Sequence, residues 1–239
     1  MSESTDEQAR SLADIAVDKP GLHLMFGGTF DPVHNGHLRM AVELREAAAR
    51  ESGLALIHLL PSRRPAHREQ PGATPEERLR MLADATAGEP GLTVDRRELD
   101  RAGPSYSVDT LAELREELGP GVPLAMAIGT DSFATLDRWN RWQEITRLAH
   151  IIVIERPGYT IGTETEAGRL LKQNRAEHFS ELIAAPSGRV LPVSLSLLDI
   201  SATDIRARLA GGRSVRYLVP DTVWRYISDR ALYSSVPSG

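Results

Sequence analysis

The sequence contains no cysteine, and this absence excludes several kinds of site. Disulfides, thiolate zinc sites, iron–sulfur clusters and a cysteine nucleophile are all ruled out. A cysteine-free chain also fits a reducing compartment, so we expect a cytoplasmic protein. Other side chains must carry whatever chemistry the protein performs.

Long apolar runs and a surplus of basic residues are also missing. No uncharged stretch approaches the length that spans a bilayer, and residues 1–20 lack the regions of a signal peptide. The formal net charge of -5 argues against a broad basic face for nucleic acid, although a small anionic ligand needs only a few local cations. We therefore expect neither a membrane nor a nucleic acid as partner.

The composition favours one sizeable folded domain, because 41% of the 239 residues are hydrophobic. From Leu22 onward, short apolar runs alternate with longer helical stretches, which is the pattern of repeated βα units around a parallel sheet. The sequence predicts a doubly wound, Rossmann-like α/β fold over residues 21–235. We interpret residues 1–20 as a mobile leader and 201–235 as a small helical C-terminal part.

The expected elements follow this alternation. Predicted strands are 22–26, 54–60, 92–95, 124–128, 149–154 and 190–193, and predicted helices are 36–50, 75–87, 107–118, 201–210 and 221–230. The β-branched run at 149–154 predicts a central strand. Residues 161–187 are polar, with helical character over 164–178, and we interpret them as a surface excursion.

The stretch GGTFDPVHNGHL, residues 27–38, directly follows the first predicted strand. In an open parallel sheet, ligands bind beyond the carboxyl ends of the strands. Gly27 and Gly28 leave the strand without β-carbons and let backbone N–H groups approach an anion, and Thr29 adds a hydroxyl. A helix begins a few residues later, so its positive end faces the same pocket. The stretch therefore predicts a phosphate site.

His34 and His37 lie at the start of that helix. Both rings can face one bound group, and a phosphate there would raise their pKa values and favour the imidazolium form. The pair could instead bind zinc, but no third ligand and no HExxH pattern accompanies it. Either histidine could also be a structural loop residue. We predict two donors to an anion and no metal site on the protein.

A second stretch, ISATDIR at residues 200–206, has two interpretations. Ser201 can cap the following helix, with Asp204 three residues later as in a capping box. The hydroxyls of Ser201 and Thr203, the backbone N–H groups and Arg206 can also be directed at phosphate oxygens. Both interpretations can hold at once.

Together the two stretches resemble the nucleotidyltransferase superfamily with the HxGH signature. GPSYSVDTL at 103–111, IGTDS at 128–132, RW at 138–139 and RPGY at 156–159 are similar, in the same order, to stretches of bacterial nicotinate-nucleotide adenylyltransferases. The resemblance covers nearly everything from Leu22 to Tyr233. It implies transfer of the adenylyl group of ATP to nicotinate mononucleotide, which gives deamido-NAD and pyrophosphate in NAD synthesis, with Mg²⁺ bridging the phosphates.

The resemblance also implies roles for single residues, each carried over from a matching position. It implies three catalytic residues at the triphosphate: His34, His37 and Arg206. It implies a larger set around ATP: Gly27, Gly28, Thr29, Phe30, Gly129, Asp131, Arg156, Ser201 and Thr203. It implies four residues at nicotinate mononucleotide: His67, Tyr106, Ser107 and Trp139. Among these, Trp139 would stack on the pyridine ring, and the backbone around Tyr106 and Ser107 would receive the carboxylate.

Some of these residues have plainer interpretations. Trp139, beside Trp142 at helical spacing, could be core, Asp131 could cap the helix that follows it, and Ser105-Tyr106 could be a turn.

Two positions depart from the family pattern. Glu155 stands where some relatives have a second basic residue, and Asn140 stands where an aromatic residue is frequent. The contacts on the adenine side and the lining of the pyridine pocket therefore stay open.

Two other functions and the oligomeric state also stay open. The chain could transfer an adenylyl or cytidylyl group to another phosphorylated acceptor, such as phosphopantetheine, or it could be a non-catalytic nucleotide-binding module. A homo-oligomer is compatible with the sequence.

Overall fold

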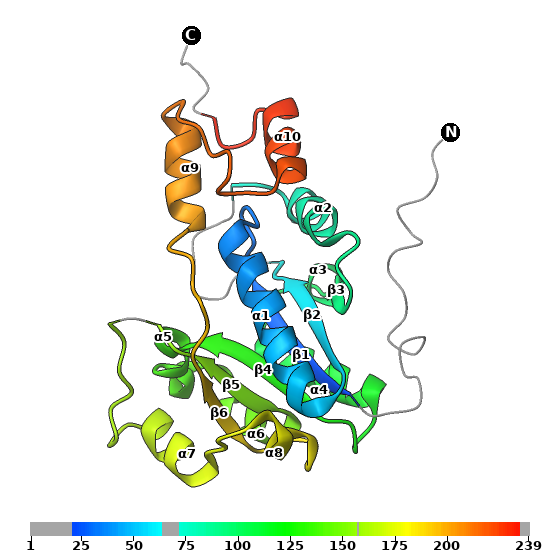
Figure 1. Ribbon diagram of the computed structural model, residues 1–239, viewed down its shortest axis with the longest axis vertical. Helices are drawn as coiled ribbons and strands as arrows, with labels where there is room; N and C mark the ends of the chain where they lie inside the picture. The colour runs from blue at the N-terminus through cyan, green and yellow to red at the C-terminus, as the bar shows by residue number, and fades with distance from the viewer. Residues whose placement is uncertain (1–20, 64–71, 157, 235–239) are drawn as a thin grey trace.

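The computed structural model describes residues 21–63, 72–156 and 158–234. Its centre is a sheet of six parallel strands in the order β3-β2-β1-β4-β5-β6 (Figure 1). The strands are β1 (Leu22–Gly28), β2 (Ala55–Pro61), β3 (Leu92–Val94), β4 (Leu124–Gly129), β5 (His150–Ile154) and β6 (Val190–Val193). This order confirms the predicted doubly wound, Rossmann-like α/β fold.

Helices pack on both faces of this sheet. They are α1 (Asn35–Ser52), α2 (Pro75–Thr86), α3 (Arg97–Asp100), α4 (Ser107–Leu118), α5 (Thr130–Phe133), the 3-10 helix η3 (Leu136–Arg138), α6 (Trp142–Leu148), α7 (Glu166–Asn174), α8 (Phe179–Ile183), α9 (Ala202–Ala210) and α10 (Asp221–Asp229). Side chains of α1, α2, α8, α9 and α10 enter one apolar cluster, and side chains of α4, α6 and α7 enter a second one. Along β1, Leu24 and Phe26 belong to the first cluster and Met25 to the second, as the alternation of a strand requires.

Local sequence signals explain several helix ends. Thr74 caps α2 with a reciprocal capping box to Glu77, and Pro75 is the first helical residue, as predicted. Gly53 ends α1 with a positive φ of 80°, which glycine adopts without strain. The boundaries that the sequence predicts for α1, α2, α4, α9 and α10 therefore lie within two residues of those in the structure.

The structure confirms one prediction of arrangement and corrects another. The strand β5 is an interior strand, paired with β4 and β6 and wholly buried, as its β-branched run predicts, while β1 and β4 occupy the middle of the sheet. Residues 161–187 are more than a surface excursion, because Ala176, Phe179 and Leu182 are buried in the core beside α1. Apolar side chains at wide spacing are enough to bury such a segment while its other positions stay polar.

The carboxyl ends of β1 and β4 lie next to each other, and from these strands the chain continues to opposite sides of the sheet. This is the topological switch point at which ligands bind in such folds. Figure 1 shows α9 and α10 well away from α7 and α8, beyond the end of α1 that carries its first residues. The fold therefore brings the C-terminal helices to the end of the sheet where residues 27–38 lie. We call residues 27–38 the first phosphate motif and residues 200–206 the second.

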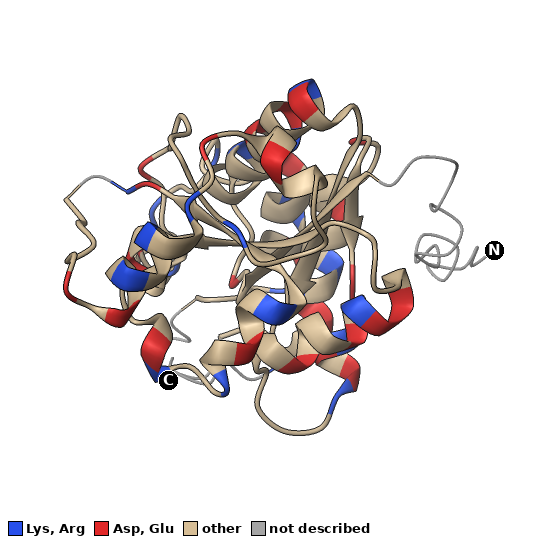
Figure 2. Cartoon of the chain, turned by 90° about the horizontal axis from the view of Figure 1, so that it is seen from below, with Lys and Arg blue, Asp and Glu red and all other residues tan. Residues whose placement is uncertain are grey.

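Charged residues are mixed over the helices. In the view of Figure 2, basic and acidic positions are interspersed, and neither sign is gathered on one side. Among the described residues, none of the helices combines the length and the apolar character that crossing a bilayer requires.

Candidate active site

The glycine pair at the end of β1 remains in the strand. Gly27 and Gly28 pair with Leu60 and Pro61 of β2, so the expectation that they leave the strand is wrong. A β-carbon on Gly28 would lie 3.0–3.2 Å from the ring of Phe30. Gly28 therefore leaves room for the ring of Phe30, which packs against the end of β1.

Phe30 supports the histidines from below. Its side chain is 1% exposed, and its ring meets the His37 ring edge to face at 5.0 Å between centroids. Its φ of 50° is unusual for a residue other than glycine, and such backbone geometry persists only where surrounding packing enforces it. A side chain so buried holds His37 in place, and any contact of Phe30 with ATP would come from its backbone.

His34 and His37 lie against each other at the first residues of α1. Their rings stack with centroids 3.7 Å apart, and His34 is the N-cap of the helix. Its Nδ1 accepts a hydrogen bond of 3.3 Å from the backbone N–H of His37. A β-carbon on Gly36 would lie 3.0 Å from the His34 ring and 3.4 Å from the carbonyl oxygen of Ile200. The glycine between the histidines therefore lets α1 approach the segment that leads into α9.

The environment of His34 keeps its ring neutral without a ligand. Burial lowers the pKa of His34 to about 4. Because Nδ1 accepts from a backbone N–H, the proton of the neutral ring lies on Nε2, which is the atom left to donate. The rise in pKa expected beside a phosphate would start from this neutral state.

Asp31 joins four segments of the chain and is a residue whose role the sequence did not reveal. Its buried carboxylate accepts hydrogen bonds from the backbone N–H groups of Gly72 and Ala73, at 2.8 and 3.1 Å, and from the Tyr233 hydroxyl at 2.7 Å. Arg206 donates from Nη1 to the Asp31 carbonyl oxygen at 2.7 Å.

Arg78 is a second residue whose role the sequence did not reveal. It is fully buried in α2, and its Nη1 donates to the carbonyl oxygen of Thr29 at 2.7 Å. Burial lowers the pKa of Arg78, and the negative charge of Asp31 opposes this shift. Arg78 therefore fastens the backbone of the first phosphate motif to α2.

The second phosphate motif lies beside the first. Ser201 caps α9 by accepting a hydrogen bond of 3.1 Å from the Asp204 N–H, which confirms the capping interpretation. Ser201 and Thr203 are both exposed, and Arg206 reaches Asp31. The structure therefore brings together two helix N-termini and one guanidinium, the combination that binds polyanionic phosphates.

The residues predicted on the adenosine side meet at the ends of β4 and β5. Arg156 Nε lies 3.6 Å from Asp131 Oδ1, and a β-carbon on Gly129 would lie 2.5 Å from that same carboxylate. Asp131 does not cap α5, because Gly129 is the N-cap and no side chain caps the helix. The Arg156 N–H also donates to the Thr130 hydroxyl at 3.3 Å. The three predicted residues therefore form one cluster.

The residues predicted at the acceptor lie on the other face of the sheet. Tyr106 is the N-cap of α4, Ser107 is its first residue, and no side chain caps this helix. Tyr106 and Trp139 are half-buried and pack against the same apolar cluster. Trp139 and Trp142 do not share a helix, because Arg141, with φ of 46°, separates η3 from α6. His67 lies outside the described residues.

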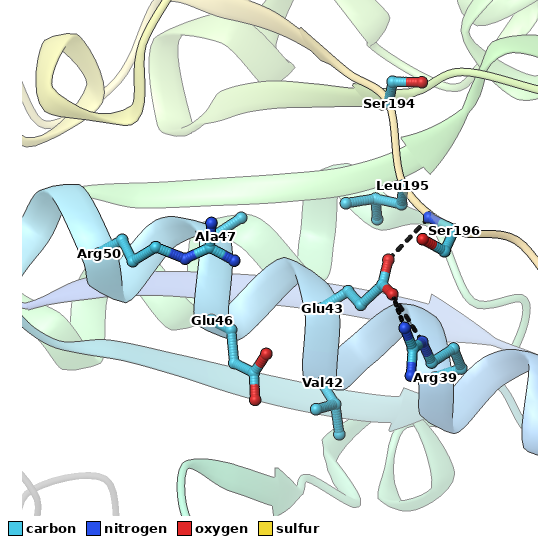
Figure 3. A pocket seen from close by; sticks show the side chains of 9 residues that line it. All are labelled: Arg39, Val42, Glu43, Glu46, Ala47, Arg50, Ser194, Leu195 and Ser196. Carbon is cyan, nitrogen blue, oxygen red and sulfur yellow. Dashed lines mark hydrogen bonds and ion pairs between the residues drawn. The ribbon is translucent and has the colours of Figure 1, made fainter.

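A cavity of about 460 Å³ lies away from these motifs, between α1 and residues 194–196 (Figure 3). Glu43 in this cavity accepts a hydrogen bond of 2.7 Å from the Ser196 N–H and is ion-paired with Arg39. These contacts fasten α1 to the segment that leads into α9. The contacts of Glu43 at this cavity therefore help to hold the two phosphate motifs in position.

No group of three or more histidine, aspartate and glutamate side chains is arranged to hold a metal ion within residues 21–63, 72–156 and 158–234.

Comparisons with known proteins agree on one group of relatives. A family model described as cytidylyltransferase-like matches residues 25–208. A curated protein of Marinobacter nauticus, named "Probable nicotinate-nucleotide adenylyltransferase", is 49% identical over 216 residues, which are 90% of this chain and 98% of that protein. A protein of Cellvibrio japonicus with the same name is 47% identical over 209 residues, covering 87% of this chain and 97% of the relative.

Solved structures show the same fold. The nicotinic acid mononucleotide adenylyltransferase of Plasmodium falciparum complexed with NaAD superposes with a TM-score of 0.65 at 16% identity, covering 89% of this chain and 97% of that chain. The Plasmodium enzyme complexed with APC gives a TM-score of 0.62, with the same identity and coverage. At this identity, the likeness bears on the fold alone.

Proposed function

The chain belongs to the cytidylyltransferase-like family and, within it, to the nicotinate-nucleotide adenylyltransferases, and we infer that it transfers the adenylyl group of ATP to nicotinate mononucleotide. The products are nicotinate adenine dinucleotide and pyrophosphate, in a step of NAD synthesis. The observation that carries nucleotidyl transfer is the meeting of two helix N-termini with Arg206 at the switch point of the sheet. The near-complete alignment with the curated relatives supports nicotinate mononucleotide as the acceptor.

In the proposed reaction, an oxygen of the acceptor's 5′-phosphate attacks the α-phosphorus of ATP. A new P–O bond forms, the bond between the α-phosphorus and its bridging oxygen breaks, and the electron pair leaves on pyrophosphate. Because the attacking phosphate is already ionised at neutral pH, no general base or protein nucleophile is required. Catalysis then depends on alignment of the reacting groups and on stabilisation of charge at the α-phosphoryl and leaving oxygens.

We assign that stabilisation to His34, His37 and Arg206, with Thr29, Ser201 and Thr203 around them. The neutral His34 ring would donate from Nε2, since its Nδ1 accepts from the backbone. Arg206 would use the donors that remain beside its bond to Asp31. The N-terminal dipoles of α1 and α9 add positive potential at the same place.

We treat Mg²⁺ as part of the nucleotide substrate. ATP carries the ion on its own phosphates, which agrees with a site whose described residues offer hydrogen-bond donors in place of a carboxylate cage. The ion would neutralise charge on the β- and γ-phosphates while the protein's donors act on the α-phosphoryl group.

On the acceptor side we propose that Trp139 stacks on the pyridine ring and that the first N–H groups of α4 bind the nicotinate carboxylate. The half-buried Trp139 and the absence of a side-chain cap on α4 support these assignments. The role of His67 in binding nicotinate mononucleotide, the cytoplasmic location and a homo-oligomer stay predictions.

The direct test is pyrophosphate release by the purified protein with Mg²⁺-ATP and a panel of acceptors. We expect turnover with nicotinate mononucleotide and a lower kcat/KM with nicotinamide mononucleotide. Turnover with phosphopantetheine in place of both would support the alternative acceptor. ATP binding without pyrophosphate release for any acceptor would support a non-catalytic module.

A further inference from the structure

Glu98 is a buried carboxylate that the proposed mechanism does not use. It lies in α3 and is 5% exposed. The hydroxyl of Thr110 donates to its Oε1 at 2.8 Å. Burial raises the pKa of the Glu98 carboxyl, and hydrogen bonds from Thr110 and Ser105 oppose that rise. A buried carboxyl group is costly for a protein to keep, so its partners indicate what it does.

The two partners of Glu98 lie on either side of the residue that begins α4. Ser105 precedes the N-cap residue Tyr106, and Thr110 lies in the first turns of the helix. The hydrogen bond from Thr110 therefore ties the Glu98 carboxylate to α4 just after Tyr106, and Ser105 acts on the same carboxylate from just before Tyr106. Because no side chain caps α4, this contact takes the place of a cap in fixing the direction of the first N–H groups.

Further hydrogen bonds make the arrangement rigid. Arg63 donates its backbone N–H to the Ser105 hydroxyl at 3.1 Å and a guanidinium hydrogen to the carbonyl oxygen of Leu99 at 2.9 Å. Arg101 donates to the Thr110 hydroxyl at 3.2 Å. Hydrogen bonds around Glu98 thus join the residues after β2 to α3 and to the start of α4.

We propose that Glu98 is a positioning residue for the acceptor substrate, one that holds the start of α4 so that its N–H groups face the carboxylate of the pyridine ring. The inference rests on the proposed function, since it presupposes that α4 binds this carboxylate. Glu98 itself touches no substrate. Correct placement of these N–H groups should favour nicotinate over nicotinamide mononucleotide. The carboxylate of nicotinate needs only donors, whereas the amide of nicotinamide also presents N–H groups of its own.

The test compares kcat/KM for nicotinate and nicotinamide mononucleotides in the wild-type protein, Glu98→Ala and Glu98→Gln. Removing a buried acceptor frees the start of α4, so Glu98→Ala is expected to lower the acid-to-amide ratio by about tenfold. Glu98→Gln keeps the shape and one acceptor oxygen, and its expected loss is about threefold. The KM for ATP should stay within about twofold in both variants, because the hydrogen bond of Glu98 is to Thr110 of α4 and not to a residue assigned to ATP.

Glu113→Gln is the matched control. Glu113 forms an ion pair of 2.6 Å with Arg101, which also donates to Thr110, but it lies on the exposed side of α4. It should keep the wild-type acid-to-amide ratio. Circular dichroism and melting temperature establish that each variant is folded, and Glu98→Gln decides the question if the alanine variant does not fold.

The outcomes separate the two proposals. A wild-type protein that prefers the acid, with an unchanged ratio in folded Glu98→Gln and Glu98→Ala, overturns the role of Glu98 alone. An equal loss for acid and amide would indicate general structural support and also overturns it. A wild-type protein without preference for the acid contradicts both the proposed substrate and the role of Glu98.

Discussion

The two ends of the sheet use the same residue types for different purposes. At the amino end, Arg115 donates hydrogen bonds to the carbonyl oxygens of Gly119, Val122, Leu148 and Pro186, which lie before β4, β5 and β6. At the carboxyl end, Arg206 has one such bond, to the Asp31 carbonyl, and its side chain is 34% exposed. An arginine whose donors are taken up by backbone supports the fold, and one with donors to spare can bind an anion.

The histidines follow the same division. Away from the carboxyl end, His23 of β1 and His58 in the middle of β2 stack and share a hydrogen bond of 2.9 Å, and His58 also bonds to the Thr93 hydroxyl at 3.1 Å. At the carboxyl end, His34 uses Nδ1 within the protein and keeps Nε2 for another partner. Residue type alone does not distinguish a structural histidine from a functional one, whereas the number of donors already used does.

The largest expected effect is on turnover, from a change at the carboxyl end. His37→Ala should lower kcat on the order of 10²–10³-fold, the cost of losing one donor aimed at transition-state charge. Steady-state pyrophosphate release measures it, and the melting temperature should change little by comparison. A folded His37→Ala protein with turnover near that of the wild type would remove the histidine from the mechanism.

The mirror experiment at the amino end is Arg115→Met. Methionine keeps much of the side-chain volume but takes the Arg115 donor from four carbonyl groups, of which, within the described residues, only Pro186 keeps a backbone donor, the N–H of Leu124. We therefore expect a loss of about 3 kcal/mol in the free energy of unfolding. Denaturant unfolding measures the loss, and kcat at a temperature where the variant is folded should stay close to the wild-type value. A catalytic defect at that temperature would mean that the two ends are not separate.

Acid should weaken the folded state through the buried histidines. Burial lowers the pKa of His23 to about 4 and of His58 to about 3, and the positive charges of Arg115 and Arg97 act in the same direction. Since the unfolded state takes up protons near pH 6.5 and the folded state does not, stability is complete above that pH and falls as pH drops toward 4. Each histidine should remove roughly 1 kcal/mol between pH 7.5 and 5.5.

Unfolding at several pH values, repeated with His58→Asn, measures this dependence. The variant should show a shallower loss of stability as pH falls, because one buried proton acceptor is gone. If stability falls with pH as steeply in His58→Asn as in the wild type, other groups cause the pH dependence. Burial lowers the pKa of His34 in the same way, so His34 also contributes to the loss of stability in acid. Saturating pyrophosphate should reduce the loss that His34 causes, because its ring would then face an anion, and should leave the loss caused by His23 and His58 unchanged.

The two ends also differ in how far the sequence predicts them. The motifs at residues 27–38 and 200–206 predict His34, His37 and Arg206 because glycines, helix starts and cations occur together within a few residues. The roles of Asp31 and Arg78 could not be predicted in this way. Arg78 sits in the charged run EERLR, which looks like a solvent-exposed helix face, and its partner Thr29 is 49 positions away.

The fold itself is well predicted because its signals are local. Alternating apolar runs give the six strands, and Thr74-Pro75 and Gly53 mark helix ends. The sequence does not predict the short helices α3, α6 and α8, because four to seven residues carry too little periodicity. Glu98 lies in one of these, and the contact that gives it meaning is with Thr110, a residue of a different helix.

The smallest expected effect tests whether the carboxyl end depends on support from outside it. Glu43→Ala removes the hydrogen bond to Ser196 that fastens α1 to the segment leading into α9, shown in Figure 3. One exposed hydrogen bond contributes little, and the apolar side chains of Leu195 and Leu197 still anchor the segment, so kcat should fall by only about threefold. Glu46→Ala is the matched control, because Glu46 lines the same cavity and its ion pair is with Arg45. Steady-state kinetics with varied ATP measures both variants. Equal kcat values in the two variants would mean that apolar packing and Arg206 alone hold α9 in position. A larger loss of kcat in Glu43→Ala than in Arg115→Met would mean that the alignment of the two phosphate motifs depends more on this one contact than on the amino end of the sheet.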